Sequence, residues 1–235
     1  MWEIWFVNSP PDVGVLIAAA GKGVRAGGSG PKQFRLIAGT PMLQRSIDRF
    51  SGHPRVRQVV VALPPDTLAA PPTWINTAGA FLTLVAGGDT RSQSVKAALG
   101  ALHSECRIVL VHDAARPFVS RETIDAVLVV AERSGAVPGA PVTDTIKRAD
   151  LTSRRVVETV DRQGLWRAQT PQGCPRTMLE RAYEIVGPVR AADVTDESAL
   201  LEAAGFEVVV VPDTVSNFKI TTEGDFVLAE AMFGS

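Results

Sequence analysis

The chain has 235 residues and a formal net charge of −1, with 24 Lys and Arg against 25 Asp and Glu. This balance excludes a general attraction to nucleic acid, so any site for a polyphosphate must be positive locally. A hydrophobic content of 46% and a charged content of 21% are ordinary for a globular protein. No apolar run is long enough to cross a bilayer, and the two cysteines are far apart. We therefore expect a cytoplasmic protein with reduced thiols and no membrane partner.

We interpret residues 1–12 as a loose N-terminal extension, because the segment lacks the basic start of a signal peptide and ends in a proline pair. Residues 13–20 form an almost unbroken apolar run, which predicts a strand buried on both faces. A glycine-rich loop follows and carries Arg25 and Lys32. Glycines bring backbone N–H groups close to an anion, and the cations add charge where phosphates would lie. The segment predicts a nucleoside triphosphate site that stabilises charge during transfer of a phosphorus centre.

Two other interpretations of this loop stay open. Residues 21–26 match the dinucleotide fingerprint G-x-G-x-x-A, which would indicate a nicotinamide-dependent oxidoreductase. The sequence Gly-Gly-Ser-Gly-Pro at 27–31 would interrupt the helix that this fingerprint requires, and no convincing acidic ribose ligand follows the next strand. The third interpretation is a surface turn without function, which does not account for the pair of cations.

The chain then alternates between strands and helices. We expect strands at residues 58–63, 81–86, 107–111, 136–140 and 206–211. We expect helices after caps at Thr40, Ser92 and Ser120 (the last ending at Gly135), near Pro175, from Thr195 to Ala204, and from Thr222. The proline-rich stretch 64–74 is expected to be irregular. This alternation predicts an α/β fold, a mostly parallel sheet with helices on both faces.

Residues 142–164 depart from this pattern. Two short strand-like segments, 143–148 and 155–160, flank a polar turn and carry too few apolar residues to bury both faces. A projecting β-hairpin arm fits this composition, and an isolated hairpin is unstable alone. We therefore expect the arm to pack on another subunit. The domain then spans residues 13–235, with the arm as an excursion within it.

Further polar residues follow the predicted strands, at the edge where parallel sheets bind ligands. Gly88 and Ser94 can recognise a base or sugar, although an ordinary capped turn explains them equally well. Asp113 suits a Mg²⁺ held mainly by phosphate oxygens and water, and Arg116 suits a phosphate; the alternative is a salt-bridged turn. Lys219 lies between apolar neighbours and either snorkels to solvent or meets an anion.

Together these segments resemble the 2-C-methyl-D-erythritol 4-phosphate cytidylyltransferase family. The resemblance is carried by residues 18–25 (AAAGKGVR), 31–33, 87–89, 111–117 (VHDAARP), 144–147, 159–162, 170–172, 195–197 and 218–221. It implies a single Rossmann-like nucleotidyltransferase domain that joins CTP and methylerythritol phosphate and releases pyrophosphate. It also implies a Mg²⁺ cofactor and a homodimer whose 142–164 arm reaches the neighbouring site.

The resemblance implies roles for individual residues. Arg25 and Lys32 stabilise the transition state and the leaving pyrophosphate. Lys219 and Arg162 orient methylerythritol phosphate, and Asp113 is associated with Mg²⁺. The cytidine pocket is formed by Ala19, Ala20, Gly21, Gly88, Asp89 and Ser94. The polyol region is lined by Arg116, Thr145, Thr170 and Thr195.

Two alternatives remain beside the oxidoreductase. A ribitol-5-phosphate cytidylyltransferase of the same family would share the CTP half of the site and differ in the polyol half. A nucleotide-binding protein without catalysis would not require both Arg25 and Lys32.

Overall fold

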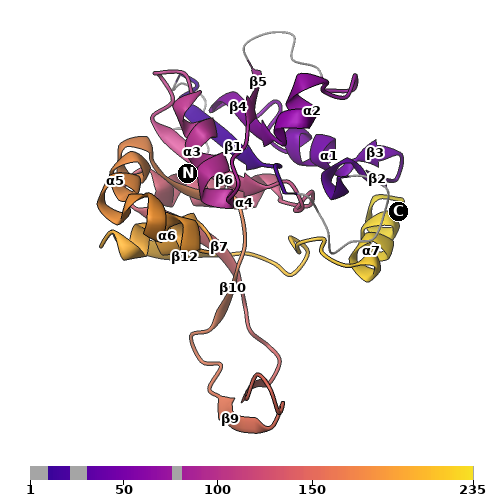
Figure 1. Cartoon of the computed structure of the whole chain (residues 1–235), viewed down its shortest axis with the longest axis vertical. Helices are drawn as coiled ribbons and strands as arrows, with labels where there is room; N and C mark the ends of the chain where they lie inside the picture. Colours follow the sequence, from indigo (N-terminus) through magenta and orange to yellow (C-terminus); the bar gives the residue numbers. More distant parts are fainter. Residues whose placement is uncertain (1–9, 22–30, 76–80, 235) are drawn as a thin grey trace.

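A computed structural model describes residues 10–21, 31–75 and 81–234 (Figure 1). In this part of the chain, eight strands form one mixed sheet in the order β10-β7-β11-β6-β1-β4-β5, with β12 paired to β7. The strands are β1 (Val13–Ala18), β4 (Val56–Leu63), β5 (Leu82–Ala86), β6 (Ile108–Asp113), β7 (Gly135–Pro141), β10 (Trp166–Ala168), β11 (Gln172–Pro175) and β12 (Val208–Pro212). The pairs β1–β4, β1–β6, β4–β5 and β7–β12 are parallel. The predicted α/β fold is confirmed.

Helices cover both faces of the sheet. Helices α1 (Met42–Asp48) and α4 (Arg121–Ala131) pack in one apolar core, and α3 (Arg91–Gly100), α5 (Arg176–Asp193) and α6 (Glu197–Ala203) pack in the other. Strand β1 separates them, since Val15 and Ile17 face the first core and Leu16 the second. The apolar run of β1 is thus explained by burial on both sides, as the sequence predicts.

The central parallel strands end level with one another. Ala18 of β1 lies beside Ala62 of β4 and Asp113 of β6 in the parallel register. The loops that leave these strands therefore start from one edge of the sheet, where ligands of doubly wound folds bind.

The C-terminal segment closes a third, smaller core. Helix α7 (Glu223–Gly234) packs on the hairpin of β2 (Leu36–Ile37) and β3 (Thr40–Pro41) through Ile37, Met42 and Phe226. An ion pair between Arg35 and Glu223, at 2.7 Å, joins the same two segments. The loop that leads to α7 is thereby held near the short helix Lys32–Phe34. No helix in the described ranges is long and apolar enough to cross a bilayer.

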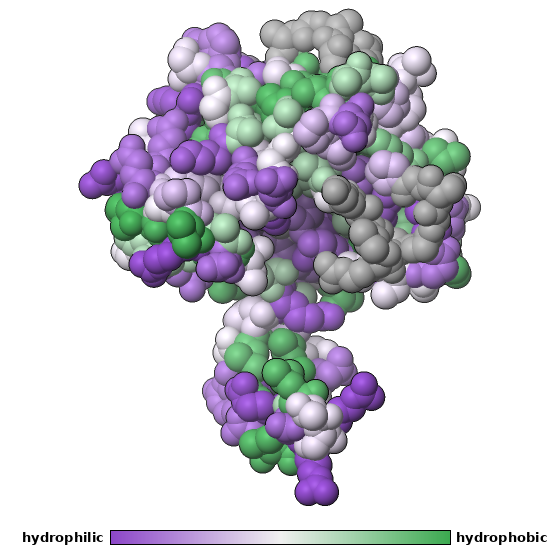
Figure 2. Space-filling model, viewed as in Figure 1, coloured by the Kyte–Doolittle hydropathy of each residue, from purple (hydrophilic) through white to green (hydrophobic). Residues whose placement is uncertain are grey.

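The 142–164 excursion is a projecting hairpin, as predicted. Strands β8 (Ile146–Ala149) and β9 (Val156–Val160) pair with each other and extend away from the domain (Figure 1). The base of the arm is fixed because β7 and β10 pair antiparallel, with Pro141 opposite Trp166. Apolar side chains lie among polar ones on the arm surface (Figure 2), with Leu151, Val156 and Val157 all strongly exposed.

Several expected helix boundaries are wrong. Thr40 lies in β3 and caps nothing; α1 begins at Met42, whose N–H bonds to the Arg35 carbonyl instead. The cap of α3 is Thr90, not Ser92, because Thr90 and Gln93 form a reciprocal capping box. Gly135 begins β7 rather than ending α4, which already ends at Ala131 with Glu132 as its C-cap.

Two other expected helix caps are confirmed, and two further expectations differ from the structure. Ser120 caps α4 as predicted, and Thr222 forms the expected reciprocal bonds with Asp225. The stretch predicted to be irregular contains α2 (Pro65–Ala69), because a proline in the first turn suits a helix start. Helix α6 starts at Glu197, two residues after Thr195, with Asp196 as its cap.

The N-terminal boundary also shifts. Residues 1–9 of the expected extension lie outside the described residues. Asp12, placed at its end, is buried and pairs with Arg55 at 3.1 Å and Arg107 at 3.0 Å. The packed domain therefore includes Asp12, one residue before the expected start.

Candidate active site

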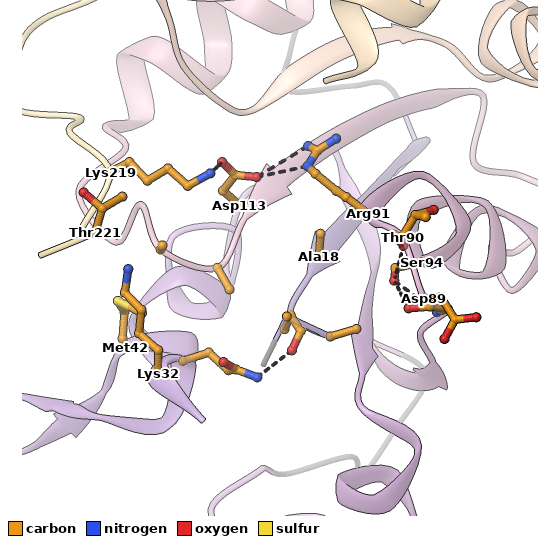
Figure 3. A pocket seen from close by; sticks show the side chains of 17 residues that line it. Ala18, Lys32, Met42, Asp89, Thr90, Arg91, Ser94, Asp113, Lys219 and Thr221 are labelled. Atoms are coloured by element: carbon orange, nitrogen blue, oxygen red, sulfur yellow. Dashed lines mark hydrogen bonds and ion pairs between the residues drawn. The ribbon is translucent and has the colours of Figure 1, made fainter. Parts of the chain in front are cut away.

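A pocket of about 740 Å³ opens at the carboxyl edge of the sheet (Figure 3). It brings together nine residues that the sequence singles out: Ala19, Ala20, Gly21, Lys32, Gly88, Asp89, Ser94, Asp113 and Lys219. It also contains residues that were not expected there: Ala18, Gln33, Met42, Thr90, Arg91, Ala114, Ala115 and Thr221. Arg25 and Lys22 belong to 22–30, outside the described residues.

One wall of the pocket consists of backbone and hydroxyl groups. Ser94 accepts a hydrogen bond from the Gly88 N–H at 3.1 Å and donates to the Thr90 carbonyl at 3.0 Å. Across the pocket, the Gln33 amide donates to the Ala19 carbonyl at 2.7 Å, which fixes the short helix against the end of β1. Such a wall can form hydrogen bonds with the polar edge of a flat ring, and it leaves little room for a large ring.

The Gly87–Gly88 turn needs glycine at its first position. A Cβ on Gly87 would lie 2.3 Å from the Ala20 Cβ and 2.9 Å from the Ser94 Oγ. Gly87→Ala should therefore push apart the two segments of this wall, costing about 1–3 kcal/mol of stability. The displaced wall should also weaken CTP binding by about tenfold or more, because a loss of about 1.4 kcal/mol in binding free energy raises the Kd tenfold.

Calorimetric titration with CTP and urea unfolding of Gly87→Ala test this expectation. Gly100→Ala is the matched control. Gly100 ends α3, the helix that follows the turn, and no atom lies within 4 Å of a Cβ added there. Equal CTP affinity for Gly87→Ala and the wild type would show that the turn does not shape the nucleotide site.

The opposite wall is charged. Lys219 binds the Asp113 carboxylate at 2.8 Å, and the Arg91 guanidinium contacts it at 3.4 Å from the other side (Figure 3). Burial disfavours the charge of this carboxylate, but Arg91, Lys219 and Arg116 together outweigh burial and hold its pKa well below the usual range. Lys32, on the facing segment, donates to the Ile220 carbonyl. The pocket thus has ammonium groups from two separate segments and an ionised carboxylate between cations.

Arg91 and Glu197 are the functional residues that sequence reasoning missed. Arg91 lies in the first turn of α3 and binds the Glu197 carboxylate of α6 at 2.8 Å. Burial raises the pKa of Glu197 and Arg91 opposes that rise. In sequence the two are 106 residues apart, and a lone arginine in a first helical turn looks like a solvated cation. The available signals are the place of Arg91, directly after segment 87–90, and the presence of Glu197 in segment 195–197, and neither indicates that the two residues pair.

Three more predicted residues lie near the pocket without lining it. Arg116 is buried, donates to the carbonyls of Asn217 and Ala168, and reaches Asp113 only at 3.9 Å. Thr170 is also buried and accepts the Asp113 backbone N–H at 3.1 Å. Thr195 is exposed on the approach to α6. In this structure Arg116 and Thr170 position Asp113.

His112 completes this support as a neutral side chain. One ring nitrogen contacts the Arg116 carbonyl and the other the Thr170 hydroxyl, both at 3.1 Å. A carbonyl can only accept, so the Nε2–H donates and Nδ1 accepts from Thr170. Burial lowers the pKa of His112 to about 4.

This pKa predicts acid sensitivity of the folded state. The unfolded imidazole takes a proton near pH 6.5 and the folded one does not, so stability is full above pH 6.5 and falls as the pH drops toward 4. The loss over this window should be about 3 kcal/mol. In urea unfolding, the stability gap between wild type and His112→Gln should narrow by that amount from pH 7 to pH 4. The exposed His103→Gln serves as control, and a constant gap for His112→Gln would contradict the expectation.

The arm residues lie elsewhere. Thr145 and Arg162 are exposed near the base of the arm and line no part of the pocket of their own chain. The Arg162 guanidinium donates to the Thr143 carbonyl across that base. Within one chain, therefore, the structure does not bring these two predicted residues to the site.

The pocket offers few of the ligands that a divalent cation needs. Among the described residues, no group of three His, Cys, Asp or Glu side chains could hold a metal ion. Mg²⁺ commonly binds through one or two carboxylates together with substrate phosphates and water. Asp113 offers an ionised carboxylate at the pocket wall, and among the described residues its Oδ1 has only the long 3.4 Å contacts with Arg91. The site fits a Mg²⁺ that arrives with a polyphosphate.

Comparison with known proteins gives a consistent result. A family model described as "IspD: 2-C-methyl-D-erythritol 4-phosphate cytidylyltransferase" matches residues 13–235. A protein of that name from Streptomyces coelicolor is 41% identical over 96% of this chain and 86% of its own length. One from Frankia casuarinae is 40% identical over 94% of this chain and 81% of its own. The crystal structure of the Thermus thermophilus protein of that name superposes with a TM-score of 0.79, at 34% identity, over 95% of this chain and 100% of that one.

Proposed function

The chain belongs to the 2-C-methyl-D-erythritol 4-phosphate cytidylyltransferase family, and we propose that the pocket at the carboxyl edge of its sheet performs that family's reaction. The enzyme joins CTP and 2-C-methyl-D-erythritol 4-phosphate to give 4-diphosphocytidyl-2-C-methyl-D-erythritol and pyrophosphate, in non-mevalonate isoprenoid synthesis. The observation that carries the proposal is one pocket with a backbone-and-hydroxyl wall on one side and cations from two segments on the other. The wall accepts a pyrimidine nucleotide, and the cations face its phosphates.

The chemistry needs charge stabilisation more than proton transfer. A phosphate oxygen of the sugar alcohol attacks the α-phosphorus of CTP in line, forming one P–O bond. The bond from the α-phosphorus to the bridging oxygen breaks, and pyrophosphate leaves with that electron pair. The nucleophile is already anionic, so no general base is required. The main obstacle is repulsion between the phosphate groups, which positioned cations offset.

Lys32 and Arg25 are proposed to stabilise the transition state and the leaving pyrophosphate. The position of Lys32 in the pocket, on the segment opposite Asp113, supports this role. Arg25 belongs to the loop that precedes Lys32. Lys219 is proposed to orient the sugar phosphate. Mg²⁺ at Asp113 would neutralise part of the triphosphate charge when bound.

The second half of the polyol site is proposed to come from another copy of the chain. Arg162 and Thr145 are polar and exposed, and the arm that carries them presents Val156 and Val157 to solvent. A homodimer in which each arm covers the neighbouring pocket would bury these valines and bring Arg162 to the sugar phosphate. We place this enzyme in the cytoplasm, which suits its two free, buried cysteines.

The test is pyrophosphate release from CTP, measured with and without Mg²⁺. Methylerythritol 4-phosphate and ribitol 5-phosphate are supplied in parallel reactions. Release with the first alone supports the proposal. Release with ribitol phosphate alone would preserve the CTP site and overturn the polyol assignment. Equal rates without divalent ions would remove Mg²⁺ from the proposal.

A further inference from the structure

Asp113 is fixed by a chain of contacts that begins outside the pocket. On β11, Gln172 donates to Asp196 at 2.9 Å and accepts the Ser198 backbone N–H at 2.8 Å. These two bonds hold the first turn of α6 against the sheet and fix the residue between them, Glu197. The Glu197 carboxylate is buried and binds Arg91, and its second oxygen has no other partner among the residues that the structure describes.

Arg91 has unequal contacts with its two acidic partners. Its Nη1 lies 2.8 Å from Glu197, whereas Nε and Nη2 both lie 3.4 Å from the same Asp113 oxygen. The shorter bond anchors the guanidinium, and its planar fork faces Oδ1 from one side. Lys219 occupies the other oxygen, Oδ2, at 2.8 Å. The carboxylate thus lies between a partly buried cation, which Glu197 anchors, and a more exposed one.

We propose that Arg91 is a positioning residue, whose guanidinium, anchored on Glu197, sets the orientation of Asp113 and thereby the place of Lys219 in the pocket. The long contacts hold the carboxylate without blocking Oδ1 as a short hydrogen bond would. A point charge does not reproduce this function, because it lacks the rigid fork that spans two carboxylates. The inference goes beyond the proposed function, on which it rests for the choice of substrates and for the role of Lys219.

The location of Arg91 allows a positioning role to be distinguished from two other roles, support of α3 and direct contact with a phosphate of CTP. Arg91 belongs to the same helix as Ser94 and lies two residues after Asp89, so a displaced helix or a lost phosphate contact would weaken the use of CTP. Loss of the orientation of Asp113 would instead act on the sugar phosphate through Lys219. Its effect on CTP would pass through the Mg²⁺ proposed at Asp113, so both KM values are measured at saturating Mg²⁺. The KM values for the two substrates therefore distinguish positioning from a general structural role.

The experiment is a double-mutant cycle with Arg91→Lys, Asp113→Asn and the double variant in the intact enzyme. We expect Arg91→Lys to lower kcat/KM for methylerythritol phosphate by about tenfold or more, with the KM for CTP changed less than about twofold. In the Asp113→Asn background the same substitution should cost less than about twofold, because residues that act through one another are not additive. Arg181→Lys, an exposed pair with Glu184 on α5, is the matched control and should behave as wild type.

An equal factor in both backgrounds would overturn the inference, as would a raised KM for CTP with normal use of the sugar phosphate. If Arg91→Lys fails to fold, Glu197→Gln replaces it, because it weakens the anchor by removing its negative charge and keeps the volume. It should give a selective loss in the same direction. Lys219→Met is measured in parallel. If it leaves the KM for methylerythritol phosphate unchanged, the assigned role of Lys219 fails, while the coupling between Arg91 and Asp113 is still decided by the cycle.

Discussion

Lys32→Ala should lower kcat by about 10²- to 10³-fold, the usual cost of removing one group that stabilises developing charge. Its effect on CTP binding should be much smaller. The ammonium group lies in the pocket on a segment held against β1 by Gln33, so it is positioned before the substrates arrive. In the proposed complex with CTP, before transfer, it would be one of several cations near the triphosphate. Charge that builds on the leaving pyrophosphate during transfer raises its contribution, and kcat reports that difference.

Steady-state kinetics and calorimetric CTP titration of the same preparation test this prediction. Lys32 also donates to the Ile220 carbonyl, so alanine could loosen the nearby C-terminal segment. Lys32→Met retains most of the stem and should show the same loss of kcat. Lys96→Ala, an exposed change on α3 outside the pocket, controls for the removal of any lysine. An unchanged kcat for both Lys32 variants would remove Lys32 from the transition state.

Mixed dimers of Lys32→Ala and Arg162→Ala chains should regain about half of the wild-type activity per mixed dimer, because two-fold symmetry makes both composite sites alike in the wild type. If each arm completes the neighbouring pocket, one site of the mixed dimer combines both defects and the other has none. Arg162→Ala alone should raise the KM for methylerythritol phosphate about 10- to 100-fold, the cost of a charged hydrogen bond, with CTP affinity retained.

Co-expression with two affinity tags isolates the mixed dimer, and the two parental homodimers set the background. Activity no higher than the mean of the parents would show that each arm serves its own chain. A monomer in sedimentation at micromolar concentration would exclude the shared site directly.

The parallel centre of the fold could be predicted because its signals are local. The run VGVLIAAA and the residues of β4 and β6 are apolar enough to indicate burial on both faces. Strands β10 and β11 could not be predicted in the same way. They span three and four residues, carry few apolar side chains, and exist because they pair with β7 and β6. Their hydrogen bonds depend on strands formed far away in the sequence.

The site residues likewise divide into those with a local signal in the sequence and those that depend on distant contacts. Lys32, Gly88, Asp113 and Lys219 each follow a predicted strand, so the sheet edge brings them together as expected. The role of Arg91 could not be predicted because it depends on an ion pair with Glu197. The two residues are 106 apart in the sequence, and no local pattern indicates that they pair. Thr170 is near the pocket through a contact with Asp113 that depends on the unpredicted β11 segment.

The arm begins and ends at neighbouring points of one antiparallel pair, where Ala140 lies opposite Arg167 and Pro141 opposite Trp166. Its length can therefore change without altering any other strand of the sheet. A two-residue turn in place of residues 143–164 would close β7 and β10 as an ordinary hairpin. Folding of the domain and the proposed self-association through the arm would thus be encoded by separable stretches of the chain. No described residue that lines the nucleotide pocket comes from this insertion, so a chain with the shortened turn should still bind CTP and lose only what the arm contributes to the second substrate.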